Sequence, residues 1–354
     1  MNSLTSMVTI VVTQRERFSH SQKSLENLYQ NTTYPFRLIY VDGNSPRPIQ
    51  KYLEKQSKAK GFQLVRKERY LFPNEARNLV LPDIDTRYVV FLDNDVEFKP
   101  GWLKALVDCA EETGAWLVGP LYCEGPLDPS GPHKDQNIHM AGGNVYFQET
   151  DGKRRLKTAH RLLKRPFSKH QHEFKRQPTE MIEYHCALVR TESFEKIGYP
   201  DEKLLTIAEH LDICMATRNA GGEVYFEPSS IVSYVTPPPF KGYDKRFYLN
   251  RWSDENNLKS LVHFQKKWDL AEDDPYLVNR VKWGMKHRLI ACQLPFSRLL
   301  KYKSKSSRLA KIISFPQRAY TKFITRKSSK LIKRLGELTR SAQLSLLFKS
   351  EVVK

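Results

Sequence analysis

The chain has 354 residues, 40% of them hydrophobic, and a formal net charge of +19. Residues 280–354 hold 20 Lys and Arg against 2 acidic residues, whereas residues 1–279 hold 38 against 37, so the excess charge belongs to the C-terminal segment. The five cysteines are scattered without a C-x-x-C pair, which argues against a disulfide framework or a cysteine zinc site and favours a reducing compartment. No run of 18 apolar residues occurs and no basic region precedes the N-terminal apolar stretch, so we expect neither a membrane span nor a signal peptide.

Short apolar runs alternate with helical segments in the first hundred residues. Strands are predicted at residues 8–12, 37–41, 62–66 and 88–92. Helices are predicted between them at residues 22–29, 48–59 and 74–81. This alternation predicts βαβ units and an α/β fold with a mainly parallel sheet. Ligands of such sheets bind outside the carboxyl ends of the strands, where Asp42 and Asp93 fall.

The pattern is weaker in the second half of the chain. Residues 124–180 are rich in Pro, Gly, His and charge, and they are predicted as long loops with a hairpin near residues 144–147. Further strands are predicted at residues 182–190 and 223–226. Further helices are predicted at residues 192–197, 207–220 and 248–268.

An acidic motif follows the predicted strand at residues 88–92. Asp93 and Asp95 form an Asp-x-Asp sequence, and their carboxylate oxygens suit Mg²⁺ or Mn²⁺. Such an ion keeps positions open for phosphate oxygens and neutralises the charge that develops on a departing nucleoside diphosphate. The structural alternative is a turn or a helix cap, because Asp and Asn favour both.

The ordered motifs of this chain resemble the bacterial-type family 2 glycosyltransferases, which have the GT-A fold, a Rossmann-like α/β domain. The matching segments of the first half are the first strand up to Thr13, VDGNS at 41–45, ARN at 76–78, DND at 93–95 and PGWL at 100–103. Those of the second half are RTESFEKIGYPDE at 190–202 and AEHLD at 208–212. Each motif is weak alone, whereas the ordered set is specific.

The resemblance implies a role for each matched residue. Asp42 would hydrogen-bond the base of the donor, and Thr13 would line the same pocket. Arg77 would lie near the donor nucleotide or its diphosphate. Asp93 would face the ribose or a metal-bound water, and Asp95 would ligate the metal directly. The structural alternatives are a cap for Thr13, an Asx turn for Asp42 and a surface ion pair for Arg77.

Inverting sugar transfer also requires a general base on the acceptor hydroxyl. The family places a carboxylate of a Glu-Asp motif there, and this chain has Glu209, His210 and Asp212 at the matching helix start. Glu209 and Asp212 share one helix face, and His210 can act as a base near neutral pH. The base is therefore expected within this trio, the alternative being ordinary first-turn residues of a helix.

A late metal-binding histidine is common in the family, but this chain has Ser233 and Tyr234 in that region. Either the metal has fewer protein ligands, or His263 or another histidine substitutes, or the metal binds only together with the donor. His185 is predicted as a strand residue that lines the acceptor cleft rather than as a ligand.

The basic C-terminal segment alternates apolar and cationic residues at near-helical spacing. A basic amphipathic helix is typical of binding to an anionic membrane surface, here through residues 280–340. A disordered tail, a protein partner and nucleic acid are the alternatives. Nucleic acid is the least favoured of them, because the sequence has no recognised nucleic-acid module.

The sequence thus predicts a GT-A catalytic domain at residues 5–270 and a basic amphipathic helical tail at residues 271–354. The predicted activity is hexosyl transfer from a nucleotide-diphosphate sugar, with Mg²⁺ or Mn²⁺, to a glycan or lipid-linked acceptor in polysaccharide or glycolipid assembly. Inversion is expected, although the fold also hosts retention. The alternatives are a nucleotidyltransferase, whose glycine-rich phosphate loop is missing at residues 13–18, and a non-catalytic sugar- or nucleic-acid-binding protein. The expected location is cytoplasmic, peripheral at the inner face of the membrane.

Overall fold

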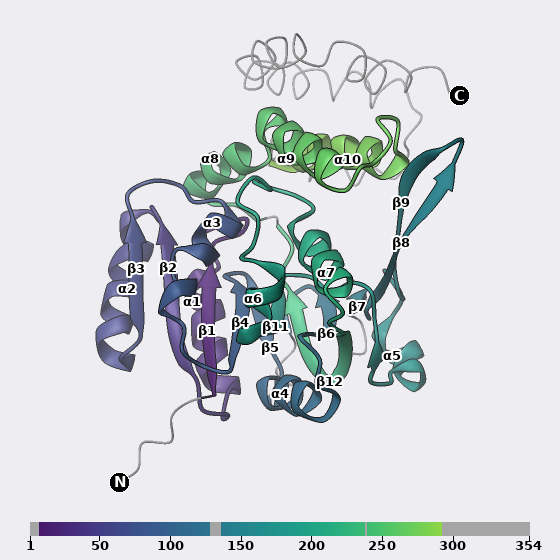
Figure 1. The fold of residues 1–354 in the computed structure, drawn as a ribbon. Helices are drawn as coiled ribbons and strands as arrows, with labels where there is room; N and C mark the ends of the chain where they lie inside the picture. The colour runs from purple at the N-terminus through teal and green to yellow at the C-terminus, as the bar shows by residue number, and fades with distance from the viewer. Residues whose placement is uncertain (1–6, 128–135, 238, 292–354) are drawn as a thin grey trace. The chain divides into compact units, whose positions relative to one another are not determined.

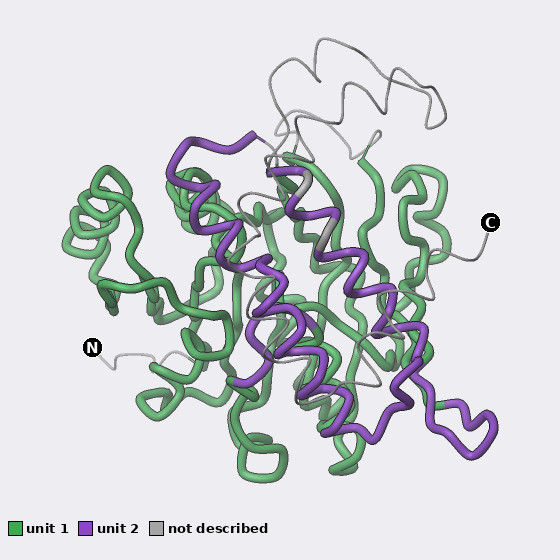
Figure 2. Tube along the Cα trace, turned by 90° about the horizontal axis from the view of Figure 1, so that it is seen from above, with its two compact units in different colours: residues 1–147, 157–202, 208–237 green, residues 148–156, 203–207, 238–354 purple. Residues whose placement is uncertain are grey.

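The computed structural model describes residues 7–127, 136–237 and 239–291, which belong to two compact units (Figure 2). Unit 1 is assigned residues 1–147, 157–202 and 208–237. Unit 2 is assigned residues 148–156, 203–207 and 238–354. All the residues of the predicted catalytic site fall in unit 1.

Unit 1 is built on one large sheet (Figure 1). Its strands are β1 Val8–Thr13, β2 Arg37–Gly43, β3 Gln63–Lys67, β4 Tyr88–Asp93, β5 Val96–Phe98, β6 Leu117–Glu124, β7 Asn137–Met140, β10 Gln177–Pro178, β11 Cys186–Arg190 and β12 Val224–Tyr234. Their order is β10-β12-β6-β11-β4-β1-β2-β3, with β5 paired to β12 and β7 paired to β6. Strands β4, β1, β2 and β3 pair in parallel, as do β6 and β12, whereas β11 is antiparallel to both of its neighbours. The predicted α/β fold with a mainly parallel sheet is confirmed.

Helices connect these strands. They are α1 Ser21–Asn31, α2 Arg47–Lys60, α3 Pro73–Asn78, α4 Trp102–Thr113, α5 Phe167–His170, α6 Phe194–Ile197 and α7 Glu209–Asn219, with 3₁₀ turns at Leu81–Asp83, Gln171–Glu173 and Thr191–Ser193. The bounds of α4 follow from Gly101 and Gly114, whose φ angles of 84° and 74° are readily adopted only by glycine. Helix α4 packs on β6 and β12.

The core of unit 1 explains why its first strands are readable from sequence. Every residue of β1 and β4 is buried, as expected for parallel strands covered on both faces. Val11, Val89 and Phe91 belong to one apolar cluster and are fully buried. Each such side chain contributes roughly 1.5–3 kcal/mol relative to an exposed one.

The pairing register brings polar side chains to one edge of the sheet. Thr13 is paired with Asp93 at the ends of β1 and β4, and Asp42 is paired with Arg66 in β2 and β3. These are the carboxyl ends of parallel strands, so the side chains that carry the sequence motifs meet at a single edge.

The antiparallel strand β11 delivers further residues to the same edge. It begins where β4 ends, since Cys186 is paired with Leu92, and His185 therefore lies beside the end of β4. Strands β6 and β12 also end there, with Glu124 paired to Tyr234.

The prediction of long loops over residues 124–180 is wrong for much of that segment. Besides β7, it contains β8 Gly143–Thr150 and β9 Lys153–His160, which form a two-stranded hairpin. Asp151 and Gly152 at its turn have φ angles of 54° and 66°, as an Asp-Gly hairpin turn requires. Only Leu156 is buried in β9, so the alternation on which the prediction depends is too weak to detect.

Unit 2 contains the helices α8 Gly242–Arg251, α9 Asp254–Lys267 and α10 Pro275–Ala291. The single helix predicted at residues 248–268 is wrong, because Ser253 ends the first segment and caps α9 by accepting a hydrogen bond from Asn256 N. The ring of Trp252 stacks on that of His287, with centroids 4.1 Å apart.

Residues 292–354, which form most of the predicted basic tail, lie outside the described residues. Residues 275–291, also assigned to the tail by the sequence, form α10, which packs with α8 and α9. None of the helices in the described part of the chain is long and apolar enough to span a membrane.

Candidate active site

Asp93 is the centre of the site at the carboxyl edge of the sheet. Its carboxylate is fully buried and lies 3.3 Å from Arg15 Nε, 2.8 Å from His185 Nδ1 and 3.7 Å from an Nη atom of Arg77. Burial alone would raise the pKa of Asp93, but Arg15, His185 and Arg77 together hold it below its usual range. Asp93 is therefore an ionised carboxylate with several cationic or hydrogen-bonding neighbours.

Asp95 lies close to Asp93, but its carboxylate has no hydrogen-bond partner of the kind that His185 gives Asp93. Both of its carboxylate oxygens are buried and accept no hydrogen bond. Burial and the charge of Asp93 raise the pKa of Asp95 well above its usual range. Ligand atoms of Asp93, Asp95 and His185 all lie within 4.8 Å of one another. A divalent cation would satisfy the buried oxygens of Asp95, so Asp93 and Asp95 fit the metal that the sequence predicts.

Asn94 holds the turn between the two aspartates. Its Oδ1 accepts a hydrogen bond from Arg15 N at 3.1 Å, and its Nδ2 donates to Arg17 O at 2.7 Å and to Ser21 Oγ at 2.8 Å. The side chain thereby fixes the loop after β1 against the acidic turn. Sequence reasoning missed this role, because an asparagine inside an Asp-x-Asp motif is only a spacer in the pattern.

Glu97 has a separate environment from the two aspartates. It accepts hydrogen bonds from Lys23 Nζ at 2.7 Å and Leu127 N at 2.8 Å, and His20 Nε2 lies 3.2 Å away. Burial opposes its charge, but these partners lower the pKa of Glu97 to about 2. It stabilises the fold here, whereas Asp93 and Asp95 face the site.

Arg15 connects Asp93 to the predicted base. Its Nη1 lies 3.4 Å from Oε1 of Glu209, the first residue of α7. Burial lowers the pKa of Arg15, but the carboxylates of Asp93 and Glu209 outweigh burial and raise it above its ordinary value. Of the other two candidate bases, His210 is half-buried and Asp212 is buried within the first turn of α7.

Arg77 supports Asp93 from inside the fold. Its guanidinium is completely buried, lies 3.7 Å from the ring centroid of Tyr184 and donates to Asn74 Oδ1 at 2.8 Å. Burial lowers the pKa of Arg77 from its ordinary value. Its contact with Asp93 adds to the positive charge that lowers the pKa of that carboxylate.

Asp42 forms a neighbouring polar cluster at the end of β2. Its Oδ1 accepts hydrogen bonds from Gln14 Nε2 at 3.1 Å and Ser45 N at 3.0 Å, and its Oδ2 accepts from Ser45 Oγ at 2.8 Å. Arg66 forms an ion pair with the same carboxylate. The Asx turn considered from sequence is thus present, and Gln14 is a member of the cluster that sequence reasoning missed.

Thr13 is buried at the end of β1, and its carbonyl oxygen accepts a hydrogen bond from Asn94 N at 3.0 Å. Because β1 lies between β2 and β4 in the sheet, Thr13 lies between the Asp42 cluster and the acidic turn.

His185, which is predicted to line the acceptor cleft, contacts Asp93 directly through its ring. Tyr234 occupies the region where the family has a late histidine, and its ring stacks on His185 with centroids 4.0 Å apart. Tyr234 also donates a hydrogen bond to Glu16 Oε2 at 2.7 Å. His263 lies on α9, in unit 2. Among the described residues, the imidazole that contacts Asp93 is that of His185, the residue before β11.

An α/β sheet with buried carboxylates at the carboxyl ends of its parallel strands is the architecture of an α/β enzyme domain and is consistent with the GT-A fold that the motifs predict. Residues 9–198 match the family described as Glycosyl transferase family 2, and this match covers more than half of the chain. The chain therefore belongs to this family and is a glycosyltransferase. A comparison with curated protein sequences found no significant match.

Solved structures of glycosyltransferases are similar to this chain at low sequence identity. The crystal structure of GalNAc-T7 with UDP, GalNAc and Mn²⁺ has a TM-score of 0.50 at 17% identity, over 84% of this chain and 57% of that longer one. Mannosyltransferase PcManGT from Pyrobaculum calidifontis, in complex with GDP-Man and Mn²⁺, has a TM-score of 0.49 at 15% identity, over 94% of this chain and 87% of that one. S. aureus TarS 1–349 in complex with UDP-GlcNAc has a TM-score of 0.44 at 13% identity, over 89% and 79% of the two chains.

Proposed function

We propose that this glycosyltransferase transfers a hexosyl group from a nucleoside-diphosphate sugar to an acceptor hydroxyl, with a divalent cation and with inversion. The observation that carries the proposal is the position of Arg15, which contacts Asp93 on one side and Glu209 on the other. The acidic turn that suits a cation–diphosphate complex and the helix start that offers a base are thereby held at one place. This combination is what a displacement with separate leaving-group and base functions requires.

Asp95 and Asp93 are the residues that would hold the cation. Bound there, Mg²⁺ or Mn²⁺ would neutralise charge on the departing nucleoside diphosphate. Arg15 and Arg77 keep Asp93 ionised and oriented before any ligand arrives. The presence of UDP and Mn²⁺ in the GalNAc-T7 crystal supports the same class of ligands for this chain.

Asp42 is the proposed acceptor of hydrogen bonds from the donor's base, with Thr13 in the adjoining wall. The carboxylate is now satisfied by Gln14, Ser45 and Arg66. Binding of a base therefore requires one of these partners to be exchanged, and Arg66 is the one whose side chain keeps some exposure to solvent, at 15%.

Glu209 is the favoured general base among the three candidates. Its position at the first turn of α7 and its contact with Arg15 fix the carboxylate relative to Asp93. In this proposal Glu209 accepts the proton of the acceptor hydroxyl, while Asp212 and His210 help to position the acceptor. A base in this role typically contributes 10²–10⁴-fold to the rate.

The sequence alone supports our proposals on the acceptor, the cellular location and the domain boundaries. We propose a glycan or lipid-linked acceptor in polysaccharide or glycolipid assembly of the bacterial type. A catalytic domain at residues 5–270 would be followed by a basic tail at residues 271–354. Through residues 280–340, that tail would bind an anionic membrane surface from the cytoplasmic side.

Calorimetric titration with nucleoside diphosphates tests the donor site. UDP, GDP and the other nucleoside diphosphates are added to the full chain with Mn²⁺, with Mg²⁺ and with EDTA. The expected result is cation-dependent binding of one nucleotide that is lost in Asp95→Asn and retained in Glu97→Gln. The Glu97 variant is a matched control, because it changes an acid two residues away that points to Lys23 instead.

Absence of nucleotide binding, or binding that is indifferent to Asp95, would contradict the proposal and favour the non-catalytic alternative. Once the donor is known, transfer rates of Glu209→Gln, His210→Asn and Asp212→Asn identify the base. The base is the residue whose variant loses kcat with an unchanged KM for the donor.

A further inference from the structure

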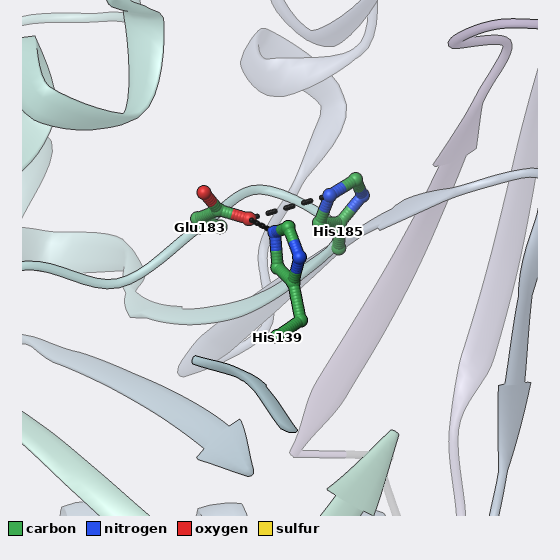
Figure 3. A group of neighbouring side chains, drawn as sticks. All are labelled: His139, Glu183 and His185. Carbon is green, nitrogen blue, oxygen red and sulfur yellow. Dashed lines mark hydrogen bonds and ion pairs between the residues drawn. The ribbon is translucent and has the colours of Figure 1, made fainter. Parts of the chain in front are cut away.

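A group of histidines and glutamates adjoins the active site without a part in the proposed reaction (Figure 3). Two imidazole nitrogens approach one carboxylate oxygen, Glu183 Oε2. His139 Nε2 lies 2.8 Å from this oxygen, and His185 Nε2 lies 3.3 Å from it. His139 lies on β7, Glu183 lies in the segment before β11, and His185 immediately precedes β11. Each of the three side chains is largely buried.

Each of the three side chains also has a second partner, on the side away from the shared oxygen. His139 Nδ1 lies 3.1 Å from Glu124 Oε1, and His185 Nδ1 lies 2.8 Å from Asp93 Oδ2. The second oxygen of Glu183 lies 3.1 Å from His160 Nε2. In the tautomer in which each Nδ1 carries the hydrogen and donates it to its carboxylate, the Nε2 lone pairs of both rings point toward Glu183 Oε2. This is the arrangement by which outer carboxylates fix the tautomer of metal-binding histidines.

We propose that His139, Glu183 and His185 bind a divalent transition-metal ion such as Zn²⁺. Two imidazoles and one carboxylate form a ligand set that suits Zn²⁺ and related ions, whereas Mg²⁺ prefers oxygen ligands alone. Ligand atoms 2.0–2.1 Å from a tetrahedral Zn²⁺ lie about 3.3 Å from one another. The observed separations of 2.8 Å and 3.3 Å are close to this value, so little movement is needed to admit the ion.

The site differs from the cation site at Asp95, and its existence does not depend on the proposed function. The acidic turn faces Nδ1 of His185, whereas the new site uses Nε2 of the same ring. The competing explanation is an ion-pair network without metal, in which His139 bridges Glu124 and Glu183. Burial would lower the pKa of His139, but these two carboxylates raise it to about 10 in that network.

Zn²⁺ titration of the full chain distinguishes the two explanations. The protein is stripped with EDTA, dialysed and titrated calorimetrically with ZnCl₂ and, separately, with MgCl₂. An Asp95→Asn background removes the predicted donor-cation site. His139→Ala and Glu183→Gln test the ligands, and Glu124→Gln tests the outer partner. His170→Ala is the matched control, because His170 also contacts a glutamate, Glu173, but lies outside the group.

The expected result is one equivalent of Zn²⁺ per chain in the Asp95→Asn background and no comparable binding of Mg²⁺. Affinity should fall at least 100-fold in His139→Ala and Glu183→Gln, fall about 10–100-fold in Glu124→Gln, and stay unchanged in His170→Ala. The visible absorption of bound Co²⁺, which reports its coordination geometry, should be lost with the same variants.

Circular dichroism of every variant checks that it folds. If a ligand variant does not fold, Glu124→Gln, which keeps all three ligands, still tests the site. Absence of stoichiometric Zn²⁺ binding in the Asp95→Asn protein would overturn the proposal. Undiminished affinity in folded His139→Ala, Glu183→Gln or Glu124→Gln protein would overturn it equally, leaving an ion-pair network.

Discussion

Arg15 and Glu209 are 194 positions apart in the sequence, yet Arg15 Nη1 lies 3.4 Å from Glu209 Oε1. Because the same guanidinium lies 3.3 Å from Asp93, the loop after β1 holds the end of β4 and the start of α7 together. The contact is buried, so neither carboxylate keeps its charge there without a cationic neighbour.

Replacing Arg15 by Gln should therefore affect both stability and activity. Two buried carboxylates would lose their shared cation, and we expect the free energy of unfolding to fall by about 3 kcal/mol. Urea denaturation at pH 7 measures this change. Arg37→Gln is the control, since Arg37 pairs with Asp85 at the surface and should cost less than about 1 kcal/mol. Equal effects of the two substitutions would show that Arg15 does not hold the carboxylates.

Asp95→Asn should stabilise the protein in EDTA while abolishing cation-dependent nucleotide binding. The buried carboxylate has no hydrogen bond, so its neutral isostere should raise the free energy of unfolding by about 1–2 kcal/mol. Since folding raises the pKa of Asp95, its destabilising effect grows as pH rises above the unfolded value, and the gain should be larger at pH 8 than at pH 4. A loss of stability in Asp95→Asn at pH 8 would contradict an unsatisfied carboxylate.

The contribution of Glu97 to stability should depend on pH in the direction opposite to that of Asp95. Its pKa is lowered to about 2 in the folded protein, so its stabilisation is complete above the unfolded pKa and is lost as pH falls toward 2. Wild type should lose about 2 kcal/mol more than Glu97→Gln between pH 6 and pH 2. Parallel urea titrations of the two proteins across this range measure the difference. Identical pH profiles would show that Lys23 and His20 do not hold the carboxylate.

Asp42→Asn separates a nucleotide role from a turn role. If Asp42 accepts a hydrogen bond from the donor's base, nucleoside-diphosphate affinity should fall about tenfold or more, since a charged hydrogen bond contributes roughly 1.5–3 kcal/mol. Ser45→Ala is the matched control, because it removes the Ser45 Oγ hydrogen bond to Asp42 without changing the carboxylate. Calorimetry with the nucleotide that binds wild type measures both variants. Equal affinities of Asp42→Asn and wild type would leave Asp42 a turn residue only.

Charge reversal in the basic segment tests the membrane proposal. Replacing Lys301, Lys303 and Lys305 by Glu should weaken binding of the full chain to vesicles with anionic lipid, since each nearby cation contributes about 1 kcal/mol. Sedimentation with phosphatidylglycerol-containing vesicles and with pure phosphatidylcholine vesicles measures the effect. Wild-type binding that is equal for both vesicle types would contradict an electrostatic anchor.

The strands β1 and β4 were predictable because all their residues are buried and most are apolar, so a local pattern suffices. A hairpin was predicted near residues 144–147, but strand β9 was missed because its residues are mostly cationic and half-exposed. The break between α8 and α9 was missed because it depends on one serine inside an otherwise helical pattern.

The residues of the candidate site that belong to sequence motifs were predictable. The contacts that depend on which strands pair in the sheet were not. Asp93 and Asp95 stand in a recognisable order of motifs, as does Glu209. The contact of His185 with Asp93 depends on β11 running antiparallel to β4, and no local pattern fixes that pairing. Arg15 was missed for the same reason, since its partners lie far away in the sequence.

The ring of His185 faces Asp93 with one nitrogen and Glu183 with the other. Burial and the nearby charge of Arg15 lower the pKa of His185, which favours a neutral imidazole with a single N–H. Two carboxylates thus share one donor, and only one of them can receive it at a time. A ligand on the lone pair at one side of the ring would commit the proton to the other side, so the tautomer of His185 couples the acidic turn to the neighbouring cluster.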